Sequence, residues 1–509
     1  MAVSTDNLRF ILGLKLRTLR QKHGYSLKDV AQASGLSVSY LSEIEKGKKY
    51  PKPDKLIDLA EAFEVPYDEL VSLSVTDELG PLKEVFSSTF VQEFPFELFG
   101  LESQDLFGLV SDKPSKAGAL IRTLLEIGRT YDVEVEHFLF AALRSYQQMH
   151  ANYFEELEVR AAAYRASHDW TGGTTPNADT LRALLESEYG YRIDTDTLSD
   201  HPDLSGFRSV YTEDGGPVLF LNGGLMPVQQ AFIYGREIGY QELGADVRAT
   251  TSSWLKVESF DQVLNNFKAS YFSGALLIDR EALADDLTAL FEQPTWDDAR
   301  FLDCMSRYQA TPEMFFYRLT ELVPNLIGLD EIFFMRFHNE AGSNDFQLTK
   351  VLNMSQVAVP HGLGRSEHYC RRWPAMQLLR TLARRQAHRT NGAPADTPIV
   401  RAQRSHFINN GAEFFVISAA RPLSLSDDTN SCVSLGFLMN DTFKERVHFW
   451  GDASVPRMDV NLTCERCPLS AAECKERTAP PTIHERDQVQ RRQEIALEQL
   501  LDGVSSADR

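Results

Sequence analysis

The sequence lacks the features that would place a protein in a membrane or outside the cell. No run approaches the ~18–20 consecutive apolar residues that a membrane span requires, and residues 1–9 lack the apolar core of a secretory signal. Only six of the 509 residues are cysteines, and in such a chain they are not expected to form a disulfide framework. We therefore expect a cytoplasmic protein that makes no membrane contact.

Positive charge is also scarce, except at the N-terminus. The chain has 52 Lys and Arg against 72 Asp and Glu, which gives a net charge of −20. Residues 1–55 contain eleven basic and five acidic side chains, a net charge of +6, so the rest of the chain carries −26. A basic head on an acidic body directs the head towards phosphate and keeps non-specific affinity low.

The basic N-terminal segment is predicted to form five short helices. Their ranges are 8–22, 26–33, 37–47, 54–63 and 67–72. Ser26 and Ser37 are good N-caps for the second and third helices, and Gly35 supplies the turn between them. On a helical wheel of the third helix, Leu41 and Ile44 face inwards. The polar side chains of this helix face outwards and are short enough to reach base edges in a major groove.

These features predict a DNA-binding surface; a small helical bundle with a solvated charged face is the alternative. The predicted DNA contacts are Ser26, Lys28, Ser37, Ser39, Tyr40, Glu43, Lys46, Lys48 and Lys49. Tyr40 and Glu43 are the expected base contacts, and the lysines are the expected phosphate contacts. Residues 16–66 closely resemble the lambda-repressor/Cro-like helix-turn-helix family. The resemblance implies a homodimer on an inverted repeat in double-stranded DNA.

Beyond residue 72 the pattern alternates between helical and strand-like segments. Residues 73–115 are interpreted as a Phe-rich linker, 116–166 as a long helical stretch and 170–177 as a break. The expected strands are 218–221, 331–337, 413–419 and 432–437, and the expected helices are 227–243, 260–277 and 487–501. This mixture predicts an α-helical head followed by a mixed α/β (α+β) body.

Residues 232–240 resemble the F-x-x-x-H-E-x-G-H helix of the ImmA/IrrE-like peptidase family. In an active member two histidines four residues apart hold zinc, and the Glu between them polarises water. Here Arg236 and Tyr240 stand at the histidine positions although Glu237 is kept, and Lys268 stands where the family has an acidic third ligand. Because these three side chains do not hold zinc, we expect the fold without an enzyme activity, with Glu237 paired to a neighbouring cation.

Three of the six cysteines, Cys464, Cys467 and Cys474, form a C-x2-C-x6-C run. Thiolates at this spacing share a metal through a tight turn, and a fourth ligand must come from elsewhere. The spacing suits both zinc and a [4Fe-4S] cluster, and free thiols in a surface loop are the third alternative. Cys304 and Cys432 are expected to be small buried apolar residues.

The C-terminal half resembles the sensor domain of the short-chain fatty acyl transcriptional regulator family. The resemblance rests on residues 333–336, on residues 370–373, and on the cysteine run with its trailing Arg477, Pro480 and Pro481. Members of this family join a Cro-like head, a degenerate peptidase-like domain and a Cys-bearing domain in the same order. The resemblance implies a short-chain acyl-CoA as effector and a [4Fe-4S] cluster as cofactor, with zinc as the alternative.

The resemblance also implies the residues that would hold these groups. The implied metal ligands are Cys370, Cys464, Cys467 and Cys474. Cys432 lies close to the place where relatives often have a cysteine, which leaves the choice between Cys370 and Cys432 open. Arg365, Arg371 and Arg372 surround Cys370 and are predicted to bind the phosphates of a CoA, although they also suit the charge of a cluster or a solvated loop.

Five segments follow from these patterns. They are 1–75, a helix-turn-helix DNA-binding domain; 76–169, a linker and helical region; 170–292, a degenerate ImmA/IrrE-like domain; 293–481, a Cys-bearing ligand-sensing domain; and 482–509, a charged helical tail. We predict a sequence-specific transcription regulator controlled by a small metabolite. An iron–sulfur redox sensor that regulates transcription is the alternative, and the missing zinc ligands disfavour a regulatory metallopeptidase.

Overall fold

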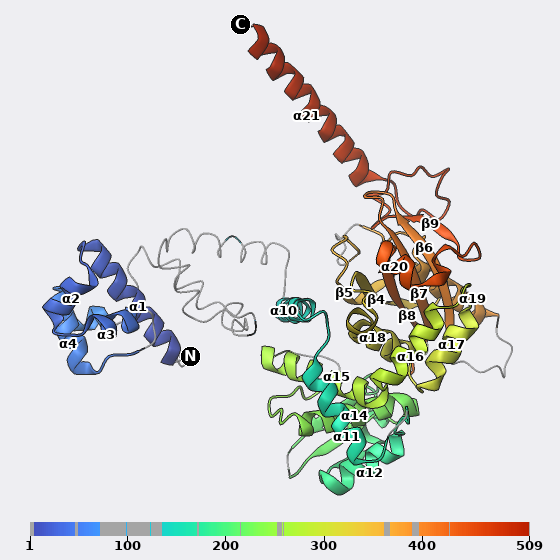
Figure 1. Cartoon of the computed structure of the whole chain (residues 1–509), viewed down its shortest axis with the longest axis horizontal. Coiled ribbons are helices and arrows are strands. Elements are labelled where there is room, and N and C mark those ends of the chain that lie inside the picture. The colour runs from blue at the N-terminus through green and yellow to red at the C-terminus, as the bar shows by residue number, and fades with distance from the viewer. Residues whose placement is uncertain are drawn as a thin grey trace. The chain divides into compact units, whose positions relative to one another are not determined.

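The computed structural model describes most of the chain in two compact units. The described residues are 5–45, 49–71, 98, 123, 135–170, 173–213, 215–251, 257, 259–360, 367–388, 397–426 and 428–507. One unit lies within residues 1–146 and 256–260, and the other within 147–255 and 261–509 (Figure 1). Among the described residues, no helix is both long enough and apolar enough to cross a membrane.

The N-terminal unit contains the five predicted helices. They are α1 (Thr5–Lys22), α2 (Leu27–Ser34), α3 (Val38–Glu45), α4 (Pro53–Ala62) and α5 (Tyr67–Val71), each within a few residues of its predicted range. The hydroxyl of Ser26 accepts a hydrogen bond from the N–H of Asp29, whose carboxylate accepts one from the N–H of Ser26. This capping box begins α2. Gly35 ends α2 with a φ of 69°, in the left-handed region that favours glycine.

The core of this unit fixes α3 against α1 and α2. Leu16, Val30, Leu41 and Ile44 are buried together, as the helical wheel predicts. A Cβ atom at Gly13 would lie 2.4 Å from the carbonyl oxygen of Ile44. Only glycine therefore lets α1 pass this close to the end of α3.

In its described part, the predicted long helical stretch 116–166 forms two separate helices. They are α10 (Val135–Met149) and α11 (Glu155–Ser167). Ala151 and Asn152 separate them, with φ values of 48° and 52°. The fully buried Asn152 donates from its side chain to Thr320, 2.9 Å away, so the break is anchored by a distant helix. Apart from Thr123, residues 116–134 lie outside the described part of the chain, as does most of the predicted linker.

A three-stranded sheet and a set of helices follow. The strands are β1 (Arg192–Asp194), β2 (Ser209–Thr212) and β3 (Val218–Leu221), in the order β1-β3-β2, with β1 parallel and β2 antiparallel to β3. The helices are α12 (Ala178–Glu188), α13 (Thr197–Asp200), α14 (Pro227–Glu242), α15 (Phe260–Leu277), α16 (Arg280–Phe291), α17 (Asp298–Arg307) and α18 (Pro312–Leu322), which continues into a π-helical turn (Val323–Ile327). The predicted strand 218–221 and helices 227–243 and 260–277 are confirmed.

Helix α14 packs very closely on α15. A Cβ atom at Gly235 would lie 2.7 Å from the hydroxyl oxygen of Ser273, and one at Gly239 would lie 2.9 Å from the carbonyl oxygen of Ala269. Two glycines four residues apart therefore bring the two backbones together. This contact buries the helix that resembles a peptidase helix.

The second sheet has six strands. They are β4 (Ile332–Glu340), β5 (Gln347–Asn353), β6 (Ile399–Phe407), β7 (Glu413–Pro422), β8 (Thr429–Leu438) and β9 (Arg457–Val460), in the order β5-β4-β8-β7-β6-β9. All neighbouring strands are antiparallel except β6 and β9. The predicted strands 331–337, 413–419 and 432–437 are confirmed by β4, β7 and β8. The observed strands continue beyond the apolar runs, mainly into polar residues such as 338–340 and 429–431. The α+β character of the body is confirmed at this level.

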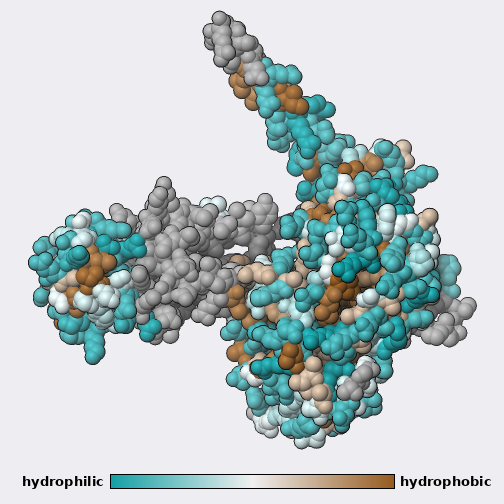
Figure 2. All heavy atoms as spheres, in the orientation of Figure 1, coloured by the Kyte–Doolittle hydropathy of each residue, from teal (hydrophilic) through white to brown (hydrophobic). Residues whose placement is uncertain are grey.

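Helices cover both faces of this sheet. α19 (Pro374–Ala387) packs on the face that includes Phe333 and Cys432, and α17 and α18 pack on the opposite face, which includes Phe334. α20 (Asp441–Arg446) and a 3-10 turn (His448–Gly451) follow β8. The last helix, α21 (Thr482–Ala507), is longer than its predicted range. Apolar side chains such as Leu497 and Leu500 are more than half exposed on it (Figure 2).

Candidate DNA interface and sensor sites

The outward face of α3 carries the predicted base contacts. Ser39 is exposed, and Tyr40 and Glu43 are half-buried. Nζ of Lys49 lies 2.7 Å from a carboxylate oxygen of Glu43 and 5.9 Å from the centre of the Tyr40 ring. Its hydrogen bond to Glu43 raises the pKa of Lys49. Tyr40, Glu43 and Lys49 thus form one polar group at the surface, with both charge signs and an aromatic ring.

The other predicted DNA contacts have different local roles. The hydroxyls of Ser26 and Ser37 accept hydrogen bonds from backbone N–H groups three residues on, at 3.3 and 3.1 Å, so both side chains cap a helix. Lys28 is exposed on α2. Lys46 and Lys48 lie outside the described residues.

An ion pair that the sequence analysis missed positions α3. Arg20 donates from Nε and Nη2 to the two carboxylate oxygens of Glu45, at 2.7 and 2.9 Å, and from Nη1 to the carbonyl of Tyr25 at 3.1 Å. Its hydrogen bond to the buried Glu45 raises the pKa of Arg20. This two-point contact ties the end of α1 to the end of α3. The available signal was the place of Glu45 four residues after Leu41, on the inward face.

Helix α14 presents a closed group of charges where an active zinc peptidase would hold its metal. Glu237 is 1% exposed and contacts the guanidinium groups of Arg236, at 3.3 Å, and Arg248. The hydroxyl of Tyr191 lies 3.4 Å from Oε2 of Glu237 and 3.2 Å from Nη1 of Arg248. The prediction that Glu237 pairs with a neighbouring cation is confirmed. We call these four residues the Glu237 group.

Arg248 is the second cation of this group and also contacts two aromatic rings. Its guanidinium lies 3.4 Å from the centre of the Tyr211 ring and 4.2 Å from that of Tyr240. Burial opposes the charge of Arg248, but Glu237 outweighs it and raises the pKa of Arg248. Both carboxylate oxygens of Glu237 are engaged. Lys268 is half-buried on α15. The group therefore stabilises the fold and leaves no free carboxylate to act as a base.

The predicted metal ligands come from two segments of the chain, and backbone hydrogen bonds join these segments. The N–H of Cys370 donates to the carbonyl of Leu462 at 3.2 Å, and the N–H of Cys464 donates to the carbonyl of His368 at 2.9 Å. Nη2 of Arg477 donates to the carbonyls of Cys464 and Cys467 at 2.7 and 2.9 Å. These bonds hold the cysteine run beside Cys370.

All four of these cysteines are buried. The relative exposures of Cys370, Cys464, Cys467 and Cys474 are only 5%, 4%, 5% and 7%. Burial raises the pKa of Cys370 to about 12, and negative charge on Cys464 and Cys467 acts in the same direction. Cys432 instead lies on β8 opposite Phe337, in the core under α19. The fold therefore brings Cys370, and not Cys432, to the cysteine run. Cys304 and Cys432 are buried, as predicted.

The arrangement of these thiols bears on the kind of metal that they suit. In the part of the chain that the structure describes, no three His, Cys, Asp or Glu side chains are gathered closely enough to hold a single metal ion. Zinc binds each of its thiolates at ≈ 2.3 Å and needs them tightly gathered. A [4Fe-4S] cluster binds each thiolate through a separate iron atom. The arrangement of these side chains therefore provides no evidence for zinc or for a [4Fe-4S] cluster.

The arginines predicted to bind CoA are engaged around the cysteines. Arg371 is buried, donates to the carbonyl of Asn344 at 2.9 Å and lies 4.6 Å from the centre of the Phe346 ring. Its buried Nε has no hydrogen-bond partner among the described residues. Arg372 contacts Glu476 at 3.4 Å, and Arg365 lies outside the described residues. The unpartnered Nε of Arg371 fits a negatively charged group held by the nearby thiolates.

A group of basic side chains lies at one end of the six-stranded sheet. Its members, here called the cationic group, are Arg208, Arg336, His338, Lys350 and Arg421. Arg336 and His338 share a face of β4, Lys350 stands opposite Arg336 on β5, and Arg421 is on β7. Arg208 comes from the loop before β2. Sequence reasoning missed this group because its members are spread over more than 200 positions and no motif links them.

One carboxylate contacts this group directly. Glu313, at the start of α18, lies 2.9 Å from a guanidinium nitrogen of Arg421. Burial alone would raise the pKa of Glu313, but the positive charge of Arg421 outweighs burial and lowers this pKa to about 2. Among the described residues, no carboxylate is in ion-pair contact with Arg208, Arg336 or Lys350. Glu313 therefore neutralises the charge of Arg421, and the positive charges of Arg208, Arg336 and Lys350 remain in excess.

The excess charge shows in how these groups titrate. Burial lowers the pKa of Arg336, and the charge of Arg208 lowers it further. Burial and the charge of Arg336 lower the pKa of His338 to about 4 and that of Lys350 to about 7. The buried Nε2 of His338 has no hydrogen-bond partner among the described residues. Arg208 and Lys350 remain accessible to water, so a small anion could reach and stabilise this group.

A cavity of about 310 Å³ adjoins the cationic group. His338 lines it on one side, and Glu340, Asp345 and Asp428 contribute acidic walls. These carboxylates repel phosphate. The cavity therefore suits a neutral polar part of a ligand, and the arginines beside it suit the anionic part.

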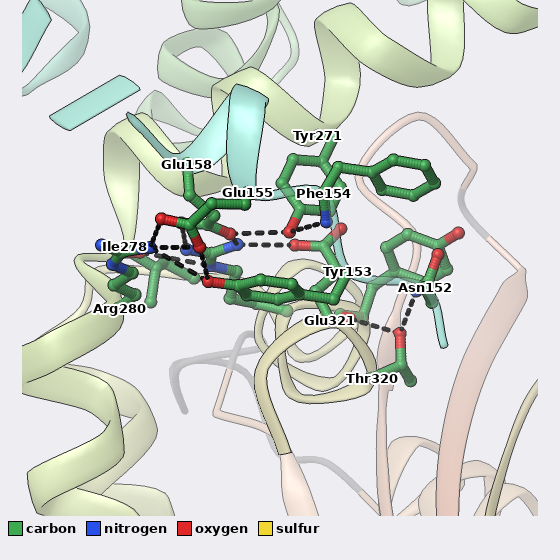
Figure 3. A network of polar contacts seen from close by, with 12 residues as sticks. Asn152, Tyr153, Phe154, Glu155, Glu158, Tyr271, Ile278, Arg280, Thr320 and Glu321 are labelled. Carbon is green, nitrogen blue, oxygen red and sulfur yellow. Dashed lines mark hydrogen bonds and ion pairs between the residues drawn. The ribbon is translucent and has the colours of Figure 1, made fainter. Parts of the chain in front are cut away.

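A balanced buried network connects α18 to α11 and α15. Arg318 donates to the two carboxylate oxygens of Glu158 at 2.6 and 2.8 Å and to Glu321 at 2.9 Å. The hydroxyl of Tyr271 donates to Glu158 at 2.7 Å (Figure 3). Burial raises the pKa of Glu321 to about 8. Because α18 also carries Glu313, one helix links this network to the cationic group.

Comparison with known proteins identifies the N-terminal segment. A family described as helix-turn-helix matches residues 16–70. The HTH-type transcriptional regulator YazB of Bacillus subtilis is 38% identical over 60 residues, which are 12% of this chain and 87% of that protein. The HTH-type transcriptional regulator y4dJ of Sinorhizobium fredii is 36% identical over 72 residues, 14% of this chain and 91% of that protein.

Other similarities cover larger proteins less completely. The HTH-type transcriptional regulator DdrOP3 of Deinococcus deserti is 40% identical over 57 residues, 11% of this chain, and the chain spans 44% of that protein's length. A solved structure of a Mycobacterium tuberculosis transcriptional regulator is similar over 67% of this chain and 93% of its own, with 18% identity and a TM-score of 0.45, too low to support an argument. Through residues 16–70, this chain belongs to the family of DNA-binding helix-turn-helix transcriptional regulators.

Proposed function

We propose that this transcription regulator binds its operator under the control of an anionic metabolite, a short-chain acyl-CoA, held by the cationic group. The observation that carries the proposal is the positive charge of Arg208, Arg336 and Lys350, none of which is in ion-pair contact with a carboxylate among the described residues. Arg208 and Lys350 are exposed and Arg336 is half-buried, so an anion can reach all three and bind to their like charges. A regulator needs a ligand site outside its DNA-binding head, and this group lies in the other compact unit.

An acyl-CoA matches the surroundings of this group in two ways. Guanidinium forks suit its phosphates. The adjoining cavity, with its acidic lining, suits neutral polar parts of the nucleotide or pantetheine arm. The proposal therefore moves the expected phosphate contacts from Arg365, Arg371 and Arg372 to the cationic group.

The same fold offers a route from ligand to DNA. An anion that binds Arg421 competes for the charge that holds Glu313 on α18, and α18 is bonded through Arg318 to Glu158 on α11. We infer a homodimer in which the ligand favours one of two arrangements of the subunits, and so one spacing of the DNA-binding heads. At the operator, Glu43 accepts a hydrogen bond from a cytosine amino group, and Lys49 moves from Glu43 to a phosphate.

The effector part is tested by calorimetric titration of the full chain with propionyl-CoA and acetyl-CoA. The double variant Arg208→Gln/Arg336→Gln is expected to bind at least about tenfold more weakly, since each lost charged hydrogen bond is worth about 1.5–3 kcal/mol. Arg182→Gln is the matched control, because Arg182 pairs with Glu186 on the surface of α12. An operator selected from genomic fragments then shows whether the ligand changes DNA affinity. Equal binding by the double variant and the parent would overturn this assignment.

A second candidate function is an iron–sulfur sensor at the four buried cysteines. It is supported by the burial of the thiols, by the backbone hydrogen bonds that join the segments of Cys370 and Cys464, and by the unpartnered Nε of Arg371. Cys370, Cys464, Cys467 and Cys474 would hold a [4Fe-4S] cluster, which would supply a charge that changes with redox state. Arg371 and Arg477 would offset the negative charge and fix the loop.

Anaerobic purification tests this second function. We expect bound iron and sulfide and broad absorption near ~400 nm. Cys370→Ser is expected to lose the iron, and Cys432→Ser, a cysteine under α19, is the matched control that keeps it. A colourless protein with one equivalent of zinc would reject the cluster. A regulatory peptidase is not proposed, because Arg236 and Arg248 engage both carboxylate oxygens of Glu237.

A further inference from the structure

The boundary between the two compact units lies inside helix α10. The first unit, which contains the DNA-binding head, extends to Tyr146, and the second unit begins with Gln147. Ala151 and Asn152, with φ values of 48° and 52°, then separate α10 from α11. Residues with a Cβ atom seldom take this left-handed conformation, and they keep it only where surrounding contacts impose it. Contacts around this junction therefore hold the end of α10 in place.

Four polar side chains supply these contacts. The side chains of Gln147 and Asn152 are buried, with only 3% and 0% of each residue exposed. Nε2 of Gln147 donates to Oδ1 of Asn152 at 2.9 Å and to the hydroxyl of Tyr317 at 2.6 Å. Nδ2 of Asn152 donates to the hydroxyl of Thr320 at 2.9 Å (Figure 3). Because Tyr317 and Thr320 lie on α18, these bonds attach the junction to that helix. We call these four residues the junction group.

The junction group is in direct contact with the cationic group. Nζ of Lys350 lies 3.3 Å from the centre of the Tyr317 ring, and the hydroxyl of the same ring accepts the bond from Gln147. Nε2 of Gln148 donates to the carbonyl of Asn353 at 2.7 Å, three residues after Lys350 on β5. Helix α18 also carries the carboxylate that pairs with the cationic group. Tyr317 therefore contacts a member of the cationic group on its face and the end of α10 at its hydroxyl.

An anion at the cationic group acts on this contact through Lys350. The side chain is exposed, its stem is flexible and the ring favours its ammonium form. A phosphate beside Arg336, which stands opposite Lys350 on β4, competes with the ring for that ammonium. Because a phenol ring is rigid, a change at its face also moves its hydroxyl. The bond between Tyr317 and Gln147 therefore weakens when Lys350 turns to the anion.

We propose that the junction group couples an anion at the cationic group to the segment that leads to the DNA-binding head. This inference rests on the proposed function and names the residues through which the anion regulates DNA binding. Tyr317 and Gln147 are positioning residues. Without an anion they hold the end of α10 on α18, and with an anion they release it. The left-handed conformation of Ala151 favours release, since the residue returns to an ordinary conformation once contacts no longer impose it.

The test compares operator affinity with and without propionyl-CoA in the full chain. Tyr317→Phe removes the hydroxyl that accepts from Gln147 and keeps the ring beside Lys350. Propionyl-CoA should change the affinity of the parent for an operator selected from genomic fragments by at least about tenfold, and that of the variant by less than about twofold. The calorimetric dissociation constant of propionyl-CoA should be the same in both. Tyr308→Phe is the matched control, because this buried tyrosine donates to Asp286 at 2.7 Å and contacts no member of the junction group through its hydroxyl.

Two results of this comparison would overturn the proposal. One is a full response to propionyl-CoA in Tyr317→Phe. The other is loss of propionyl-CoA binding in that variant, which would place the hydroxyl in the ligand site. Gln147→Met removes the other end of the same bond and keeps the length of the side chain. The double variant should lose no more of the response than either single variant, because both remove one bond. Losses that add would mean that the two residues act separately.

Further outcomes separate this inference from the proposed function. If propionyl-CoA binds the parent but leaves operator affinity unchanged, the ligand site stands and the coupling is wrong. If propionyl-CoA does not bind, the acyl-CoA function fails, and inorganic pyrophosphate then serves as the anion. Pyrophosphate should speed hydrogen exchange of the backbone amides in residues 135–152 of the parent. In Tyr317→Phe this exchange should already be fast and should not respond. Unchanged exchange in the parent would overturn the coupling as well.

Discussion

The Glu237 group and the cationic group lie in the same compact unit and both contain arginines, but only in the first does a carboxylate contact every arginine. In the Glu237 group, one buried carboxylate meets two guanidinium groups and a tyrosine hydroxyl. In the cationic group, Glu313 meets Arg421, whereas Arg208, Arg336 and Lys350 have no such partner among the described residues. The two groups occupy a peptidase-like helix and the end of a sheet, respectively.

This difference separates a structural role from a ligand-binding role. A buried carboxylate that is engaged through both oxygens holds its neighbours in one arrangement, and a ligand cannot enter without breaking these contacts. Accessible arginines and lysines without a carboxylate partner are free to bind an anion. The contacts of Glu237 therefore indicate a structural role, and the accessible cations lie elsewhere.

The largest expected effect comes from breaking the Glu237 group. Glu237→Gln keeps the size of the side chain but leaves Arg236 and Arg248 buried without a counter-charge. We expect the free energy of unfolding to fall by about 3–5 kcal/mol, measured by urea denaturation of the full chain. Glu186→Gln, in an exposed ion pair on α12, is the control and should change little. A loss below about 1 kcal/mol would mean that the Glu237 group is not the structural element described.

Removal of a member of the cationic group is expected to raise the free energy of unfolding instead of lowering it. Arg336→Met relieves repulsion and should raise the free energy of unfolding by about 1 kcal/mol in the absence of ligand. Propionyl-CoA at a hundredfold excess over its dissociation constant should stabilise the parent by about 2.7 kcal/mol and the variant much less. Thermal shift with and without the ligand measures both effects. A destabilised variant that still responds to the ligand would contradict the comparison.

The sequence could predict those parts whose contacts are local. The caps at Ser26 and Ser37 and the inward face of α3 depend on residues within a few positions of one another, so the DNA-binding head could be predicted almost completely. The cation that pairs with Glu237 could be expected, because a buried carboxylate needs one. Its identity as Arg248 could not, since that residue reaches back from the loop after α14.

Contacts between distant segments set the limit. The cationic group joins a loop before β2 to three strands of another sheet, and no periodicity links those positions. Arg371 and Arg372 could be predicted to lie near the cysteines, but not that their hydrogen bonds would run to Asn344 and the cysteine loop. Lys350 carries no local signal at all. Its character comes from the cross-strand neighbour Arg336 and the ring of Tyr317.

The pH dependence of stability sharpens the comparison through His338. Its folded pKa is lowered from 6.5 to about 4, so below 6.5 the unfolded chain binds a proton that the folded chain does not. Its contribution to stability is therefore complete above about pH 6.5 and is lost as the pH falls towards 4. The measurement is the urea midpoint as a function of pH. His338→Gln should reduce the fall of the midpoint between pH 6.5 and 4, whereas His201→Gln, at an exposed residue, should not. A bound anion should raise the pKa of His338 in the folded chain, and it should therefore narrow the pH range over which stability is lost.

The smallest effect on stability is expected for the exposed pair of Glu43 and Lys49, which is balanced but solvated. Because water screens it, Glu43→Gln should leave the urea midpoint of the chain unchanged. Its effect should appear on DNA instead, where a Gln prefers adenine to the cytosine that Glu accepts from, a change in discrimination of about tenfold at one base. Lys49→Gln is the matched variant, and it should weaken all sequences alike and lower the salt slope by about 1. Binding selections on both variants measure this. If Glu43→Gln unfolds the head or leaves base preference untouched, then balance in this pair, as in the Glu237 group, serves the fold and not recognition.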